Sequence, residues 1–156
     1  MVTLQPMTEA EFLRLIEPVI AGYARSHVED GQWTEHEAGE KSRQETQKLL
    51  PAGVATPNHY LFTILGAAQQ KVGMLWFEVR TSQRTAFVYY VGIDEPFQRR
   101  GYASEAFGEL ERVVAALGCT RISLHVFGRN RAAVELYTKS GYEMTNILMT
   151  KRLDPQ

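Results

Sequence analysis

The sequence predicts a mixed α/β fold in which helices flank a mostly antiparallel β-sheet. The hydrophobic period changes along the chain from helical to strand-like and back, and the links between the strands of the middle segment are short. After a short strand at residues 2–5, the predicted order is two helices, three strands, and then helix, strand, helix and strand. This order indicates one mixed sheet covered by helices.

The N-terminal segment is predicted to form two helices. Thr8 and Thr34 each precede a glutamate by three residues, which is the capping-box pattern of a helix start. We expect Pro18 to kink or split the first helix, because proline removes a backbone donor, and Gly31 to mark its end. The second helix should run to about Leu50, just before a Pro-Ala-Gly stop.

Strands and helices alternate over the rest of the chain. Aromatic and β-branched runs predict strands, and apolar residues at helical spacing predict helices. The strands are expected at residues 60–65, 72–79, 86–93, 122–127 and 147–153. The helices are expected at residues 101–117 and from 130 to just before 141.

The composition is that of an ordinary globular chain, with 156 residues, 44% of them hydrophobic and 22% charged. We expect one domain over residues 1–156, with an N-terminal part at 1–57 and a core at 58–156. The formal net charge of −1 argues against a nucleic-acid ligand. No apolar run approaches the roughly 20 residues of a membrane span, so no membrane partner is expected.

Cysteine and histidine usage bears on redox compartment and metal binding. The single Cys119 cannot form an intramolecular disulfide, which fits a reducing compartment. The first residues hold no basic stretch followed by an apolar core, so we expect a cytoplasmic protein. The four histidines lack the spacing of metal ligands, and no metal is expected.

A short basic loop at residues 98–103 joins the apolar strand at 86–93 to the helix that follows. A helix N-terminus carries unpaired backbone N–H groups and a partial positive charge, so this place suits a phosphate. The loop has neither a Walker A motif nor a dinucleotide-binding glycine fingerprint. Taken alone, it is equally consistent with a solvated basic turn.

Two spaced motifs resemble those of the Gcn5-related N-acetyltransferase (GNAT) family. The first is Gln/Arg-x-x-Gly-x-Gly/Ala after an apolar strand, where this chain has Gln98, Gly101 and Ala103. The second is an asparagine, an alanine, a Leu-Tyr pair and a Gly-aromatic pair, found here between residues 130 and 142. They occur in the family's order, and the resemblance covers about residues 60–153. The N-terminal helices are similar to those of a bacterial subgroup of small acetyltransferases.

The resemblance implies a GNAT-like acyl-CoA N-acyltransferase fold, with a central sheet that splays between its fourth and fifth strands. It implies acetyl-CoA as co-substrate, with the pantetheine arm paired like an added strand against Val91, Gly92 and Ile93. The pyrophosphate would be held by backbone N–H groups of the loop and the helix start. This part of the cofactor site comprises Gln98, Arg99, Arg100, Gly101, Tyr102, Ala103 and Ser104.

Two cofactor-binding positions have features of their own. Family members often carry glycine where Arg99 stands, but the role there uses the backbone N–H, so we expect binding to persist. The Arg99 side chain is also a candidate for contact with a CoA phosphate. Gly92, inside a strand, is typical of a bulge or a close backbone approach, although a glycine tolerated in a core strand is the alternative.

Tyr137 is the candidate general acid that the resemblance implies. Asn130, Ala133 and Tyr137 are spaced i, i+3 and i+7, so they share one helix face, which would contact both the pantetheine arm and the sulfur. A thiol has a reference pKa of about 8.5 and a tyrosine about 10, so a nearby phenol can protonate the leaving thiolate. The alternative is that Tyr137 is a core aromatic and Asn130 only a helix cap.

The general base is left open. Many family members use a carboxylate on the central strands, sometimes through water, but the strand at 86–93 contains no acid. Glu78 on the preceding strand is the candidate that we assign, with Tyr89 and His125 as others. His125 is expected on the sheet face opposite its strand neighbours. Each of these could equally be a packing residue beside the sheet.

The function implied is acetyl transfer from acetyl-CoA to a primary amine by direct attack in a ternary complex. The acceptor class is a small-molecule or peptide amine, and the helices of residues 1–57 are expected to form one wall of its site. The alternatives are an acyl-CoA-binding sensor on the same fold and a generic α+β binding domain. Exposed strand edges make a homodimer a further expectation.

Overall fold

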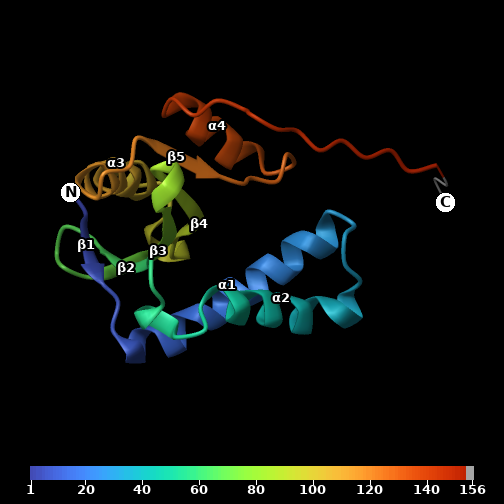
Figure 1. The fold of residues 1–156 in the computed structure, drawn as a ribbon, viewed down its shortest axis with the longest axis horizontal. Helices are drawn as coiled ribbons and strands as arrows, with labels where there is room; N and C mark the ends of the chain where they lie inside the picture. Colours follow the sequence, from blue (N-terminus) through green and yellow to red (C-terminus); the bar gives the residue numbers. More distant parts are fainter. Residues whose placement is uncertain (154–156) are drawn as a thin grey trace.

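The computed structural model describes residues 1–153, and Figure 1 shows the course of the chain. Five strands and four α-helices follow one another, with three short 3₁₀ turns between them. The strands are β1 (Thr3–Pro6), β2 (His59–Leu65), β3 (Lys71–Arg80), β4 (Thr85–Ile93) and β5 (Arg121–Leu124). The helices are α1 (Glu9–Glu29), α2 (Glu35–Leu49), α3 (Tyr102–Ala116) and α4 (Arg131–Lys139). The 3₁₀ turns are η1 (Gly53–Ala55), η2 (Thr81–Gln83) and η3 (Glu95–Phe97).

All five strands form one sheet in the order β1-β2-β3-β4-β5. The first three pairings are antiparallel, and β5 runs parallel to β4. The pairing of β4 with β5 ends at Val88 and Leu124, while β4 continues to Ile93. The predicted mixed sheet is therefore confirmed, and it opens between its fourth and fifth strands.

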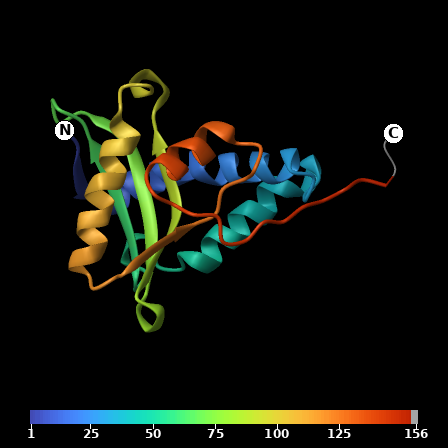
Figure 2. The ribbon, with the colours of Figure 1, turned by 90° about the horizontal axis from the view of Figure 1, so that it is seen from above.

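Helices cover both faces of the sheet, as the two views of the ribbon show (Figures 1 and 2). One face packs against α3 and α4, around a core of Ile64, Val72, Leu75, Phe77, Phe107 and Leu110. The other face packs against α1, around a core of Ile16, Val19, Ile20, Leu61, Met74 and Trp76. Alternate residues of β2 and β3 supply the two cores, because successive side chains of a strand point to opposite faces.

The predicted helix starts are confirmed at both capping boxes. The hydroxyl of Thr8 accepts from the N–H of Glu11 at 3.1 Å, and Thr34 accepts from Glu37 at 3.4 Å. Helix α1 ends just before Gly31, which has a φ of +78° as a C-terminal glycine requires. We expected Pro18 to kink or split α1, and the split was wrong: α1 continues through Pro18 as one helix from Glu9 to Glu29.

The predicted last strand at residues 147–153 was also wrong. Residues 143–153, which we call the C-terminal arm, have no regular secondary structure and lead away from the body of the molecule (Figures 1 and 2). Apolar alternation alone does not make a strand; a strand also needs a neighbour to pair with. The large apolar side chains of the arm are exposed: Met144, Ile147, Leu148, Met149 and Leu153.

Candidate active site

A β-bulge in β4 reorganises the sheet beside the opening. Trp76 pairs with Tyr90 and Phe77 pairs with Val88, so Tyr89 is an extra residue in β4. The bulge breaks the alternation of side chains, and both Tyr89 and Tyr90 pack against the core on the α1 face. Two consecutive tyrosines therefore reach one face at the point where β4 loses its pairing with β5.

Polar side chains from three strands meet next to this bulge. Oε1 of Glu78 accepts hydrogen bonds from the Tyr89 hydroxyl at 3.0 Å and from Nε of Arg80 at 3.2 Å. Oε2 of Glu78 lies 3.8 Å from Nε2 of His59. The indole Nε1–H of Trp76 donates to Nδ1 of His59 at 3.0 Å. These five residues, which we call the Glu78 cluster, place one carboxylate among several donors.

Burial sets the protonation states around the carboxylate. Desolvation is the main cause that raises the pKa of the Tyr89 phenol, so the phenol keeps its proton and donates to Glu78. Desolvation is also the main cause that lowers the pKa of His59, against the opposing effect of the Glu78 charge. His59 is therefore neutral at pH 7, and Arg80 is the fixed positive charge beside Glu78.

Sequence reasoning found Glu78 and Tyr89 but missed His59, Trp76 and Arg80. The missing information was the register: His59 is the direct cross-strand partner of Glu78. His59 and Glu78 lie 19 positions apart in the chain, so no local pattern links them. Arg80 follows Glu78 at the i+2 spacing of a strand face, which was a usable signal. Its guanidinium also lies 4.4 Å from the centre of the Phe87 ring.

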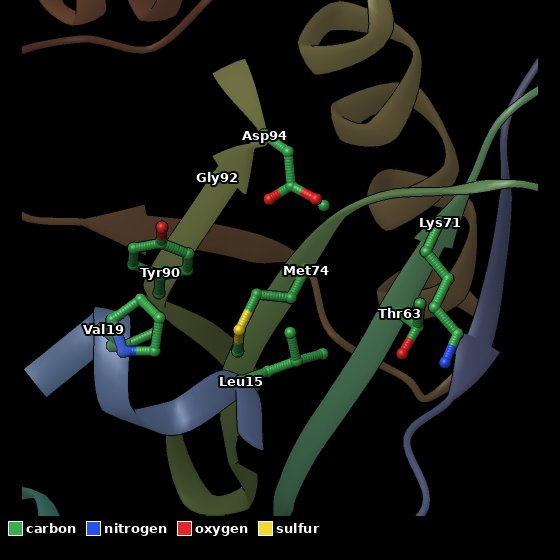
Figure 3. Close-up of a pocket in the computed structure, with 10 residues that line it drawn as sticks. Leu15, Val19, Thr63, Lys71, Met74, Tyr90, Gly92 and Asp94 are labelled. Carbon is green, nitrogen blue, oxygen red and sulfur yellow. The ribbon is translucent and has the colours of Figure 1, made fainter. Parts of the chain in front are cut away.

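A groove lies between α1 and the part of β4 beyond the bulge (Figure 3). Leu15 and Val19 of α1 form its apolar side, and Tyr90 and Gly92 of β4 face them, with Asp94 at the end of the strand. Burial, followed by the charge of Asp94, raises the pKa of Tyr90. The groove thus offers an apolar wall, a neutral phenol and a carboxylate beside the sheet opening.

The backbone approaches closely at Gly92, although the bulge itself lies at Tyr89. A side chain on Gly92 would collide with the ring of Tyr90, and one on Gly73 would collide with the Gly92 carbonyl. Val91 and Ile93, the neighbours of Gly92, pack against the core on the α3 face. Past Val88, the side of β4 that faces β5 has no paired strand within residues 1–153.

The loop before α3 presents a row of backbone donors. Gly101 has a φ of +83°, and the helix begins at Tyr102. Within residues 1–153, no group accepts a hydrogen bond from the backbone N–H of residues 99–104, and the first N–H to find a partner is that of Glu105. The side chain of Gln98 folds back, and its Nε2 donates to the Ile93 carbonyl at 2.8 Å. The loop is thereby tied to the end of β4.

Arg99 adopts the left-handed conformation, with a φ of +63°. Glycine enters this region without steric cost, whereas a residue with a Cβ pays for it. The conformation gives a physical reason for glycine to be frequent there in the family that the sequence resembles. The side chains of Arg99 and Arg100 are exposed, and Arg100 lies 5.8 Å from the centre of the Phe97 ring.

Helix α4 carries the residues of the second motif. Asn130 is its N-cap and accepts from the Ala133 N–H at 3.2 Å. The ring of Tyr137 packs edge-on against Phe107 at 5.3 Å and Tyr142 at 5.7 Å. Burial raises the pKa of Tyr137, so its phenol stays protonated. Tyr137 lies on the α3 face and Glu78 on the α1 face, and the opening between β4 and β5 separates the two sides.

His125 does not join the Glu78 cluster. The strand predicted at 122–127 ends at Leu124, so His125 lies beyond β5, and the expected strand position was wrong. Its ring meets that of Phe127 edge-on at 5.1 Å. The early end of β5 follows from its pairing, because β4 and β5 share hydrogen bonds only up to Val88 and Leu124.

Residues 1–153 contain neither a metal-ligand cluster nor a helix of membrane-spanning character. No three histidine, cysteine, aspartate or glutamate side chains in this range gather in a way that could hold a metal ion. None of the helices in the same range combines the length and the apolar character that crossing a membrane would take.

Residues 23–142 match the model of the acetyltransferase (GNAT) family. The chain belongs to the GNAT family. It is 39% identical to the uncharacterized N-acetyltransferase YdgE of Bacillus subtilis over 153 residues, which cover 97% of this chain and 98% of YdgE. This GNAT protein is thus an acyltransferase enzyme, as the two sequence motifs predicted.

Solved structures agree with this assignment. The crystal structure of YycN from Bacillus subtilis, likewise an uncharacterized N-acetyltransferase, superposes with a TM-score of 0.94 at 34% identity, over 98% of this chain and 99% of that one. AAC(6')-Iy in complex with the bisubstrate analog CoA-S-monomethyl-acetylneamine superposes with a TM-score of 0.64 over 99% of both chains. At 14% identity, the second likeness concerns the fold alone.

Proposed function

We propose that this GNAT protein transfers an acetyl group from acetyl-CoA to a primary amine, which attacks the thioester directly in a ternary complex. One observation carries the proposal: the opening in the sheet lies between a row of unpaired backbone N–H groups and a carboxylate surrounded by donors. The N–H groups can therefore bind the phosphates of acetyl-CoA while the carboxylate binds the acceptor amine, with the thioester in the opening between them.

The donor half of the site uses backbone groups. The N–H groups of residues 99–104 and the N-terminus of α3 bind the pyrophosphate, since they are unpaired and aligned with the helix dipole. The pantetheine arm pairs with β4 at Val91, Gly92 and Ile93, where the strand has no partner on the β5 side. Asn130 and Ala133 contact the arm from the start of α4, and Asn130 also caps that helix.

The acceptor half of the site centres on Glu78. An aliphatic ammonium must lose a proton before its nitrogen can attack, and the Glu78 carboxylate accepts that proton, directly or through a water. Tyr89 and Arg80 hold Oε1, which leaves Oε2 as the more open oxygen. Tyr89 is a hydrogen-bond donor in this arrangement, so it orients the base and does not act as one.

Tyr137 serves the leaving group. Burial raises the pKa of its hydroxyl, which keeps the proton on oxygen at neutral pH. The phenol is a weaker acid than the thiol of CoA. It therefore donates a hydrogen bond to the departing sulfur and shares its proton as negative charge develops there. The packing of its ring against Phe107 and Tyr142 fixes the direction of that bond.

The acceptor site is bounded by the N-terminal helices. Leu15 and Val19 of α1 form the apolar side of the groove beside Tyr90 and Asp94. This arrangement suits a small-molecule or peptide amine that has an apolar part next to its ammonium group. The fold-level likeness to AAC(6')-Iy with its CoA bisubstrate analog is consistent with an amine bound beside CoA. Acetyl-CoA as donor and a cytoplasmic location belong to the same proposal.

A homodimer is also part of the proposal. The edge of β5 opposite β4 has no paired strand within residues 1–153, and the C-terminal arm exposes Ile147, Leu148 and Met149 by 65 to 85%. Open strand edges and unpaired apolar segments are surfaces that copies of one chain cover for each other.

The direct test is a thiol-release assay with acetyl-CoA and a panel of primary amines. We expect turnover with at least one amine, and loss of that turnover in Glu78→Gln but not in Glu135→Gln, which removes an exposed carboxylate on α4. Tight CoA binding with no turnover over the whole panel would contradict the proposal and favour the acyl-CoA sensor.

A further inference from the structure

His59 is the one member of the Glu78 cluster whose protonation pattern is dictated by a neighbour. The indole of Trp76 can only donate a hydrogen bond, and its Nε1–H points at Nδ1 of His59 from 3.0 Å. Nδ1 must therefore be the acceptor nitrogen. In the neutral imidazole the proton then sits on Nε2, which is the nitrogen 3.8 Å from Oε2 of Glu78.

The ring of His59 is held rigidly in this orientation. Its side chain is 7% exposed. It stacks on the Tyr89 ring at 5.8 Å, and Tyr89 stacks in turn on Trp76 at 4.7 Å. The rings of Tyr89 and Trp76 thus fix both the place of the imidazole and the direction of its Nε2–H.

We propose that Trp76 and His59 form a positioning pair that locks one imidazole tautomer and aims its N–H at the carboxylate that receives the acceptor's proton. The inference rests on the proposed function, since it takes Glu78 as the group that meets the amine. A carboxylate has about four lone-pair sites. Tyr89 and Arg80 donate to two of them on Oε1. The Nε2–H of His59 is aimed at Oε2 from 3.8 Å, so the rest of Oε2 is the site for the ammonium.

The pair aims a donor at the carboxylate of Glu78. A hydrogen bond to a carboxylate favours its charged form, and the Nε2–H of His59 is the donor that the pair directs at Oε2. A protonated His59 would have no acceptor for the Trp76 indole, and this loss acts together with burial to keep the ring neutral. At 3.8 Å the N–H reaches Glu78 through a small side-chain movement or one bridging water.

The other charged and titratable groups around the pair are few. Glu78 and Arg80 lie on β3, and Tyr89 lies on β4. From the helices, Tyr23 of α1 lies near Tyr89 and near Glu45 of α2; burial first, and then these two groups, raise the pKa of Tyr23. Arg80 is the positive charge that opposes protonation of His59.

The first test needs no substrate. Nitrogen-15 NMR of the imidazole side chains, assigned to His59 by comparison with His59→Gln, should show a single tautomer with the proton on Nε2. Trp76→Phe should give a mixture of tautomers, whereas Trp33→Phe, which alters the other tryptophan, should not. A wild-type His59 with its proton on Nδ1 would overturn the inference.

The second test is the pH profile of kcat/KM with an amine that the enzyme acetylates. His59→Leu removes the donor to Glu78, so the acid limb should move to higher pH and the rate at pH 7 should fall about tenfold. His59→Gln, whose amide can both accept and donate, should recover part of the loss. His36→Leu is the control, since His36 is exposed on α2.

The outcomes of the second test separate two failures. An unmoved acid limb in His59→Leu, with a cooperative melting transition that shows a folded protein, would overturn the inference and leave the proposed function standing. If no variant and no wild-type protein acetylates any amine, the proposed function fails, and the NMR tautomer still decides whether the pair exists. If His59→Leu does not fold, Trp76→Phe replaces it, with the tautomer of His59 as the measured quantity.

Discussion

The Tyr89 hydroxyl donates a 3.0 Å hydrogen bond to Oε1 of Glu78, across the pairing of β4 and β3. The bulge makes this contact possible, because Tyr89 is the extra residue whose insertion brings two consecutive tyrosines to one face. The bond orients the carboxylate, and Arg80 supports the same oxygen. This hydrogen bond therefore marks the acceptor side of the proposed site.

We predict that Glu78→Gln lowers kcat by about 10²- to 10⁴-fold, which is the usual contribution of a general base. Glutamine keeps the size and can still accept from Tyr89, so the fold should persist. The measurement is steady-state kinetics with a saturating amine between pH 6 and 10. A rate that recovers at high pH, where free amine is abundant, supports a base; an equal loss at every pH would contradict it.

Tyr137→Phe should lower kcat by about 10- to 100-fold, with little change in the KM for acetyl-CoA. The phenylalanine ring preserves the packing against Phe107 and Tyr142, and only the proton donor is lost. Tyr60→Phe is the matched control, since it removes the hydroxyl of a tyrosine that stacks on Phe77 of β3 and is not assigned a role in the reaction. A wild-type rate in Tyr137→Phe would remove Tyr137 from the mechanism.

Substitutions at Arg99 and Gly101, the two positive-φ residues of the loop at 98–103, should have different effects on the KM for acetyl-CoA. Gly101→Ala places a Cβ at a φ of +83°, which costs about 1–2 kcal/mol and should raise the KM for acetyl-CoA several-fold. Arg99→Gly relieves the strain at a φ of +63° and keeps the backbone N–H, so its KM should stay within about threefold. A tenfold rise in Arg99→Gly would mean that the arginine side chain itself binds a phosphate.

Light scattering coupled to size exclusion tests the dimer. Leu148→Asp puts a charge on the exposed apolar surface of the C-terminal arm and should shift a dimer toward monomer. Thr150→Asp adds the same charge to a polar position of the same arm and should have less effect. A wild-type protein that is monomeric at high concentration would refute the homodimer.

Acid should weaken the anchor between the start of α1 and β3. The Lys71 ammonium, followed by the Thr8 backbone N–H, lowers the pKa of Glu11 from 4.5 to about 2. Because the folded-state pKa is the lower one, this stabilisation is complete above about pH 4.5 and disappears as the pH falls toward 2. Urea unfolding from pH 6 to 2.5 should show a steeper acid decline for the wild type than for Glu11→Gln.

Local rules accounted for much of the fold. Thr8 and Thr34 define helix starts because a capping hydroxyl and its N–H partner are only three residues apart. The strand at 86–93 and the helix that follows it were predicted from their periodicities alone. The proposed donor loop follows from the same local information, since a strand, a short loop and a helix start are contiguous in the chain.

The prediction failed where pairing between distant segments decided the outcome. The sequence of residues 147–153 does not show whether another strand lies beside them to pair with. Within the described residues, no strand pairs with them. His125 was placed on a strand that stops one residue earlier, because β5 pairs only as far as β4 follows it. Pro18 lies inside α1 without ending it, although its local effect is to remove one backbone donor.

The sequence by itself determined the family, the order of the elements as far as α4 and the proposed acetyl-CoA loop, because each depends on residues close together in the chain. The tertiary structure alone decided what surrounds Glu78. His59 meets it through the register of β2 and β3, Tyr89 through a one-residue bulge, and Trp76 through a hydrogen bond to His59. Strand register is set by the packing of whole faces against α1 and α3, so no short stretch of sequence contains it.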